Sequence, residues 1–303
     1  MMENLWNGVY PAITTKFKDD QTLDLEKFTN NIDSQIEAGV DGIILGGSLG
    51  EASTLTEKEK YHLLEHSLSH VAGQVPVILN IAEQATFAAV DMARHAEKAG
   101  AQGIMLLPPM RYKADDRETV KYFTDVAAAT ALPVMIYNNP VDYKIFVSLD
   151  MFEELAKYPN INAVKDSTRD TTNVTRMINR FGDRYKILCG VDTLAMESLL
   201  MGADGWVAGL VAAFPRETVV LYKLMKQNRT AEARQLFRWF LPLLELDIHP
   251  KLVQYIKLAE SRTGLGTEHV RSPRLVLEGE ERTKILKIID HGIASRPELP
   301  KVE

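Results

Sequence analysis

Short apolar runs recur along the chain at intervals of about 20 to 35 residues, which is the spacing of strand–helix units. Most of these runs do not alternate polar and apolar residues, so we expect them to be buried on both faces, as the strands of a parallel sheet are. The eight runs are residues 9–13, 42–46, 75–79, 103–107, 133–137, 161–164, 185–189 and 205–209.

Amphipathic stretches with helix signals lie between the runs. Thr56 and Glu59 stand at the spacing of a capping box, and Gly39, Gly100 and Gly202 stand where a helix is expected to end. Strand–helix alternation repeated eight times predicts an α/β fold, a (β/α)₈ TIM barrel. A doubly wound sheet is the alternative, but eight similar units fit a closed barrel better. One helix is predicted to begin at residue 56, and the others are predicted at residues 86–98, 116–130, 149–157, 171–181 and 193–201.

The strand pattern stops after residue 214, and the following amphipathic stretches predict helices at residues 217–225, 231–246, 250–263 and 279–293. No linker rich in glycine or serine separates them from the barrel. We therefore expect a barrel over residues 1–227 and a C-terminal helical region over residues 228–303 that packs on it. The tail, residues 295–303, is expected to be loosely ordered.

Composition and charge narrow the classes of protein. The 303 residues carry a formal net charge of -6, which leaves no basic surface for nucleic acid. The single cysteine, Cys189, excludes an internal disulfide and suits a reducing compartment. No run reaches the roughly 18 apolar residues of a membrane helix, and the N-terminus lacks the features of a signal peptide. A soluble cytoplasmic protein is expected.

Lys165 ends the sixth apolar run, at the carboxyl end of a strand, where the active sites of such barrels lie. A lysine there can lose solvation, which lowers its pKa, and the neutral amine can then attack a carbonyl and form a Schiff base. The alternative is a solvated lysine that caps the strand and pairs with Asp166. Taken alone, the alternative is favoured, because most lysines are solvated.

Two other strand ends supply partners for this chemistry. The second run leads into a glycine-rich loop, residues 46–50, whose backbone N–H groups and Ser48 hydroxyl suit a carboxylate. The fifth run ends at Tyr137, whose phenol could transfer a proton. An ordinary tight turn and packing at the barrel rim are the alternatives. A lysine, a tyrosine and an anion-binding loop at one barrel mouth suit Schiff-base chemistry on a 2-oxo acid.

Three motifs carry a resemblance: Gly47-Ser48-Leu49-Gly50-Glu51, Tyr137-Asn138-Asn139-Pro140 and Val164-Lys165-Asp166-Ser167. In order and spacing they resemble the dihydrodipicolinate synthase and N-acetylneuraminate lyase family of class I aldolases over nearly the whole chain. The resemblance implies that Lys165 forms the Schiff base and that Tyr137 carries protons. It also implies that the substrate carboxylate rests on Gly47, Ser48 and Leu49.

We also expect four further substrate-binding residues near strand ends: Arg111, Asn139, Gly190 and Val207. The lysine imine itself serves as the electron sink, so neither a metal nor an organic cofactor is expected. The resemblance implies a homotetramer that binds a small 2-oxo or cyclic imino acid, with no nucleic-acid or membrane partner.

Departures from the family pattern bear on the substrate. Synthase-type members usually carry two hydroxylated residues where this chain has Ser48 and Leu49, and a tyrosine from a neighbouring subunit where it has Arg111. Arg111 could instead bind a substrate carboxylate or an intersubunit partner. Where those members have an arginine that grips the second substrate's carboxylate, this chain has Asp142. An acid there would repel aspartate semialdehyde, which argues against dihydrodipicolinate synthase activity.

A finer resemblance points to the hydroxyproline-degradation branch of the family, which includes 1-pyrroline-4-hydroxy-2-carboxylate deaminase. It is carried by the segments at residues 108–112, 143–144, 271–275 and 296–300. We therefore expect Lys165 to attack C2 of the cyclic imine and the C4 hydroxyl to leave as water, with Tyr137 and Ser48 carrying protons. Hydrolysis then releases ammonia and 2,5-dioxopentanoate. The alternatives are a pyruvate-dependent synthase, a sialic acid lyase, a 2-keto-3-deoxy sugar acid aldolase or dehydratase, and a non-catalytic ligand-binding barrel.

Two further groups of side chains have a functional and a structural interpretation. His62, His66 and His70 share a helix face and could hold zinc, but a solvated face away from the strand ends is favoured. Asp166 and Asp192 flank the predicted mouth and could tune Lys165, but structural pairing is favoured.

Overall fold

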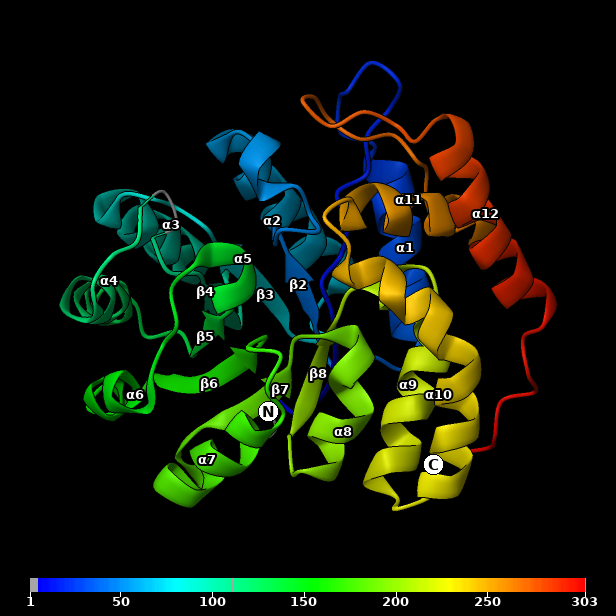
Figure 1. Ribbon diagram of the computed structural model, residues 1–303. Coiled ribbons are helices and arrows are strands. Elements are labelled where there is room, and N and C mark those ends of the chain that lie inside the picture. The colour runs from blue at the N-terminus through cyan, green and yellow to red at the C-terminus, as the bar shows by residue number, and fades with distance from the viewer. Residues whose placement is uncertain (1–4, 110–111, 303) are drawn as a thin grey trace.

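Eight parallel strands form a closed barrel within residues 5–109 and 112–302, which the computed structural model describes (Figure 1). The strands are β1 (Gly8–Pro11), β2 (Ile43–Leu45), β3 (Val77–Ile81), β4 (Gly103–Leu106), β5 (Val134–Asn138), β6 (Ile161–Asp166), β7 (Lys186–Cys189) and β8 (Gly205–Ala208). Their order in the sheet is β1-β8-β7-β6-β5-β4-β3-β2. The ring closes where Ile13 N donates to Ile44 O at 3.0 Å. The predicted (β/α)₈ barrel is confirmed.

Helices surround the barrel, and local signals define several of their ends. Thr56 and Glu59 form the predicted capping box at the start of α2, and Gly39 ends α1 in the left-handed conformation with φ 85°. No helix among the described residues is both long and apolar enough to cross a membrane. The barrel helices are α1 (Leu25–Ala38), α2 (Glu57–Val71), α3 (Thr86–Ala99), α4 (Asp116–Ala128), α5 (Pro140–Tyr143), α6 (Leu149–Leu155), α7 (Thr172–Phe181), α8 (Ala195–Leu200) and α9 (Pro215–Lys226).

The inside of the barrel is a packed core that is closed at its N-terminal end. Trp6 is buried there, and its Nε1 donates to Asn162 Oδ1 at 2.8 Å, next to the start of β6. A Cβ added to Gly103, at the start of β4, would lie 2.9 Å from the Trp6 ring. Glycine is therefore required at this point of close approach. The described residues therefore fill this end, and the pocket that contains the strand-end residues lies at the opposite end of the barrel.

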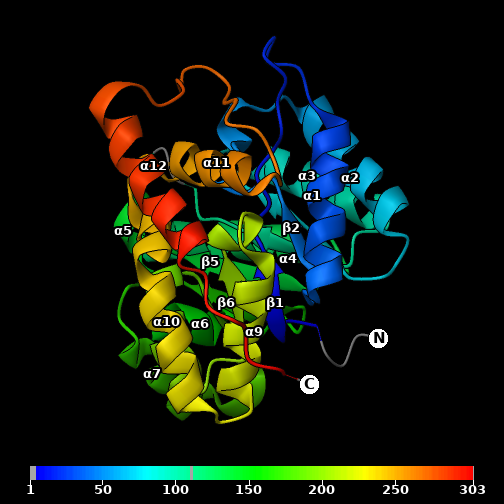
Figure 2. The same cartoon turned by 90° about the vertical axis from the view of Figure 1, so that its right-hand side faces the viewer.

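The C-terminal helices α10 (Thr230–Leu244), α11 (Leu252–Thr263) and α12 (Gly279–Ala294) pack beside the barrel (Figures 1 and 2). The last turns after α10 form a 3₁₀ helix, η5 (Glu245–Ile248), where the sequence predicts a longer α-helix. This turn contacts η3 (Asp192–Leu194), the short 3₁₀ helix that follows β7. The C-terminal region therefore reaches the carboxyl ends of the strands.

The prediction of a loosely ordered tail is wrong for the described part of residues 295–302. Arg296 Nε lies 3.0 Å from a carboxylate oxygen of Glu217, and Arg229 Nη1 donates to Lys301 O at 2.6 Å. Leu299 and Val302 pack against the core. Polar contacts and apolar side chains together hold this segment along the barrel. Its position at the end of the chain gave no sign of these contacts.

Two fully buried ion pairs join the barrel mouth to α11. Lys16 Nζ lies 2.7 Å from Glu260 Oε1, and Lys257 pairs with Glu51, whose side chain is fully buried. Glu51 Oε2 also accepts from Arg271 N at 3.2 Å. Because Glu51 directly follows the glycine-rich loop, these bonds tie that loop to the C-terminal region.

We predict that Glu51→Ala lowers the free energy of unfolding by about 3–5 kcal/mol, because it leaves the Lys257 ammonium buried without its carboxylate. Urea unfolding followed by circular dichroism measures the change. The matched control is Asp125→Ala, which removes the acid of an exposed ion pair with Lys121 and should leave the midpoint almost unchanged. An equal shift in both variants would contradict this account of the buried pair.

Candidate active site

Lys165 and Tyr137 lie side by side at the carboxyl ends of β6 and β5. The parallel register pairs the two residues directly, and side chains at paired positions point to the same face of a sheet. Both line the pocket at this end of the barrel, and the Lys165 Nζ lies 4.0 Å from the centroid of the Tyr137 ring. The strand register, rather than any flexible loop, therefore sets the geometry of the pair.

The Lys165 amine is buried, with 7% of the residue exposed. Burial lowers its pKa, and the charges of Tyr143, Asp247 and Asp192 oppose that shift. No described residue accepts a hydrogen bond from Nζ. Asp166 does not pair with it, since its carboxylate accepts from Thr168 N and Asn173 Nδ2, both at 2.9 Å. The alternative in which Lys165 caps the strand against Asp166 is therefore wrong.

The Tyr137 hydroxyl accepts a hydrogen bond from Asn139 Nδ2 at 3.2 Å. Burial raises the pKa of Tyr137 to about 12, while hydrogen bonds from Asn139 and Ser167 oppose the shift. Asn139 also donates to Asp142 Oδ2 at 2.7 Å. A phenol with a raised pKa is protonated at neutral pH and can act first as a proton donor.

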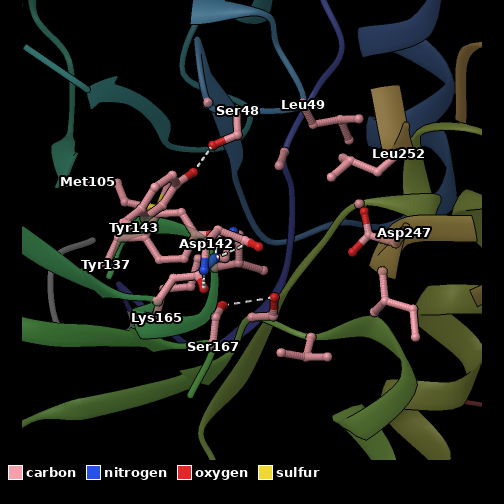
Figure 3. Close-up of a pocket in the computed structure, with 18 of the residues that line it drawn as sticks. Ser48, Leu49, Met105, Tyr137, Asp142, Tyr143, Lys165, Ser167, Asp247 and Leu252 are labelled. Atoms are coloured by element: carbon pink, nitrogen blue, oxygen red, sulfur yellow. Dashed lines mark hydrogen bonds between the residues drawn. The ribbon is translucent and has the colours of Figure 1, made fainter. Parts of the chain in front are cut away.

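Ser48 hydrogen-bonds to Tyr143 across the mouth of the pocket (Figure 3). The Tyr143 ring meets the Tyr137 ring edge to face, with centroids 5.5 Å apart. From the sequence, we expect Ser48 to work with Tyr137, and Tyr143 has no predicted role in the site. A signal for Tyr143 was available, because it lies six residues after Tyr137 in the segment that leaves the same strand end.

The loop from Gly47 to Leu49 presents backbone N–H groups to the pocket. Ala52 N donates to Gly47 O at 3.2 Å and Glu51 N donates to Ser48 O at 3.1 Å, so the two carbonyl groups are engaged. The N–H groups of Ser48 and Leu49 have no acceptor among the described residues. Adjacent free N–H groups of this kind can form a cradle for an anion, and the carboxylate-binding role of this loop stays a prediction.

The pocket brings together all the predicted site residues that the structure describes, whereas Arg111 lies outside the described residues. Gly190 leaves room for the lysine, because a Cβ there would lie 2.7 Å from Lys165 Cε. The pocket encloses about 680 Å³ of empty space, open solvent included. Its predicted residues are Gly47, Ser48, Leu49, Tyr137, Asn139, Lys165, Gly190 and Val207.

Several residues that line the pocket are not among the site residues predicted from the sequence. Besides Tyr143, they include Ser167, Arg169 and Asp247. Ser167 stands within a motif noted for Lys165, and its Oγ donates to Gly190 O at 2.9 Å. Arg169 is exposed and follows β6. Its position just after a strand end was the signal that could have identified it as a site residue. Asp247 comes from the C-terminal region, about 80 residues from Lys165 in the chain, and no motif marks it.

The remaining candidates have structural partners. Asp192 is fully buried and accepts from Leu210 N at 2.7 Å and from Trp206 Nε1 at 2.9 Å. His66 bonds to Thr29 and His70 to Asp33, both on α1, at 2.8 and 2.6 Å. The described residues include no group of three side chains that could hold a metal ion. The histidine column therefore connects α2 to α1 and is not simply solvated.

A buried amine of lowered pKa, an adjacent phenol and a cradle for a carboxylate are the groups that imine formation with a 2-oxo acid requires. The amine would supply the nucleophile and the phenol the proton. The cradle would orient the carbonyl carbon toward the amine.

Comparisons with known proteins agree with this geometry. The model of the Dihydrodipicolinate synthetase family matches residues 5–292. The 4-hydroxy-tetrahydrodipicolinate synthase of Exiguobacterium sibiricum is 32% identical over 276 residues, which cover 90% of this chain and 92% of that protein. The crystal structure of dihydrodipicolinate synthase from Aquifex aeolicus matches with a TM-score of 0.90 and 26% identity, covering 94% and 97% of the two chains. A prophage protein of the dihydrodipicolinic acid synthase family from E. coli K12, in complex with pyruvate, matches with a TM-score of 0.89 and 27% identity, covering 95% and 99%.

Proposed function

The chain belongs to the dihydrodipicolinate synthetase family of Schiff-base lyases, and we propose that Lys165 forms the imine with a small 2-oxo acid while Tyr137 transfers the protons. One observation carries the proposal. The Lys165 amine is buried beside the Tyr137 ring and has no hydrogen-bond acceptor among the described residues. A buried amine without a partner is costly for folding alone, which favours a catalytic reason for its position.

The proposed reaction begins when the neutral Lys165 amine adds to C2 of the 2-oxo acid, whose carboxylate lies on the Ser48 and Leu49 N–H groups. The C2 hydroxyl of the resulting carbinolamine takes the Tyr137 proton and leaves as water, and the nitrogen forms a protonated imine. The Tyr137 phenolate then removes a proton from C3 and becomes a phenol again. The resulting enamine is the species from which a carbon–carbon or carbon–oxygen bond is made or broken.

Pyruvate is the first substrate to test, because the family relative from E. coli K12 was solved in complex with it. The named relatives are synthases, so they favour a pyruvate-dependent reaction and give no support to the deaminase predicted from the finer resemblance. One observation retains the deaminase as a second candidate. Asp142 and Asp247 line the pocket, and acidic side chains there disfavour binding of the carboxylate of a synthase's second substrate.

Turnover of a substrate panel distinguishes the candidates. The panel consists of pyruvate with aspartate semialdehyde, a 2-keto-3-deoxy sugar acid, and 1-pyrroline-4-hydroxy-2-carboxylate. Ammonia release from the last substrate would establish the deaminase. Aldol cleavage or dehydration of the sugar acid without ammonia release would establish an aldolase or dehydratase instead. Absence of turnover and of any imine adduct throughout would contradict the proposed chemistry and favour a ligand-binding barrel. The homotetramer implied by the resemblance and the cytoplasmic location expected from the composition stay predictions.

A further inference from the structure

Asp247 brings a carboxylate from the C-terminal region into the pocket. It lies in η5, beside Ile248 and near Leu252 of α11, and all three residues line the site. Figure 3 shows Asp247 on the opposite side of the pocket from Lys165 and Tyr137. A substrate held on Lys165 through its C2 carbon, with its carboxylate on the glycine-rich loop, would therefore extend its remaining carbons toward this wall.

The Asp247 carboxylate has neither a hydrogen bond nor an ion pair among the residues that the structure describes. It lies against the end of β8, since a Cβ added to Gly209 would be 2.1 Å from Asp247 Oδ1. The N–H groups of Gly209 and Leu210 are already taken by Asp192, at distances of 2.7 to 3.2 Å. Burial raises the pKa of Asp247 well above its usual range, and the nearby Asp192 carboxylate adds to the shift.

Asp247 is partly buried in the wall of the pocket, and a carboxyl group that has lost part of its hydration and has no donor in the protein can take one from the ligand. A substrate carboxylate could not supply it, and the burial and the Asp192 charge that raise the pKa of Asp247 also disfavour a further negative charge beside it. Arg169 lines the same pocket and is exposed, but it makes no ion pair with Asp247 within the described residues and leaves that carboxylate without a donor. A substrate hydroxyl is neutral and donates one hydrogen bond.

We propose that Asp247 determines specificity by accepting a hydrogen bond from a hydroxyl group on the far end of the substrate, so that the protein selects hydroxylated 2-oxo acids over those that end in a carboxylate. This inference rests on the proposed function, because it needs the substrate to be anchored on Lys165. It deepens that function by naming the substrate class and by giving the C-terminal region a direct contact with the substrate.

Borohydride trapping of imines tests the inference without requiring turnover. Three five-carbon 2-oxo acids differ only at C4 and C5: 4-hydroxy-2-oxopentanoate has a hydroxyl on C4, 2-oxopentanoate has none, and 2-oxoglutarate ends in a carboxylate. The concentration that gives half-maximal adduct is measured by mass spectrometry for each, with pyruvate as the reference, and adducts of cleavage products are counted with the intact ones. We expect the hydroxylated acid to need about tenfold less than 2-oxopentanoate, the effect of one well-formed hydrogen bond, and 2-oxoglutarate to need the most.

The decisive quantity is the ratio between 2-oxopentanoate and the hydroxylated acid within one variant, because changes in Lys165 reactivity cancel. Asp247→Ala should reduce that ratio to about one, and Asp247→Asn, which is nearly the same size, should reduce it in part. Glu245→Gln, an exposed acid in the same turn that does not line the pocket, is the matched control and should keep the wild-type ratio.

The outcomes distinguish a failure of the inference about Asp247 from a failure of the proposed function. An adduct with pyruvate together with an unchanged ratio in Asp247→Ala would overturn the inference alone. Preference of the wild-type protein for 2-oxoglutarate would also overturn it and would indicate that Arg169 grips a second carboxylate. Absence of an adduct with pyruvate and with every other acid would overturn the proposed function itself.

Discussion

Replacing Lys165 with alanine is expected to lower kcat by at least about 10⁴-fold, because the variant retains the pocket but loses the nucleophile on which the imine forms. The side chain lies at a strand position fixed by its register with Tyr137. The loss should therefore reflect chemistry rather than a change of fold. Steady-state turnover of whichever panel substrate the wild-type protein accepts measures the effect.

Two further variants make this test specific. Lys165→Arg keeps a cation of similar length but has no amine that can form the imine, and we expect the same loss of turnover. Lys144→Ala removes an exposed lysine that is close to Tyr143 in the chain but does not line the pocket, and it should keep wild-type turnover. Full turnover in Lys165→Ala would identify a different reaction, and unchanged ligand affinity without any wild-type turnover would favour a binding protein.

Replacing Tyr137 with phenylalanine is expected to lower kcat by about 10²- to 10⁴-fold, the range for loss of a positioned general acid–base group. The ring would still pack beside Lys165, so the cradle and the amine should remain in place. Borohydride should therefore continue to trap a pyruvate adduct, although more slowly, since Tyr137 also protonates the leaving hydroxyl. The combination of a retained adduct and lost turnover is the specific signature of a proton carrier.

The control for this prediction is Tyr158→Phe, which removes a hydroxyl outside the pocket and should leave kcat unchanged. A Tyr137→Phe variant with wild-type turnover would transfer the proton role to another group. Tyr143 would then be the first candidate, because it bonds to Ser48 and its ring contacts that of Tyr137.

The barrel could be predicted from the chain because its strands are buried on both faces and leave a continuous apolar signal. Helix ends could be predicted where the signal is local, as at the capping box of Thr56 and Glu59 and at Gly39. The tail could not, because its order depends on contacts such as Arg296 with Glu217 that lie far apart in the sequence.

The residues of the candidate site could likewise be predicted only in part from the sequence. Lys165 and Tyr137 could be found because both end predicted strands, and strand ends meet at one face of a barrel. Asp247 could not, because it enters the pocket from a 3₁₀ turn whose position depends on how α10 and α11 pack on the barrel. The pairing of Ser48 with Tyr143 rather than with Tyr137 likewise depends on side-chain packing that spacing alone does not encode.

The central claim is that Lys165 carries the imine. Its most direct test is reduction of the protein with borohydride in the presence of pyruvate, followed by peptide mapping with mass spectrometry. We predict a single reduced pyruvate adduct, on the peptide that contains Lys165, and no such adduct in Lys165→Ala. An adduct on a different lysine, or its persistence in Lys165→Ala, would contradict the claim.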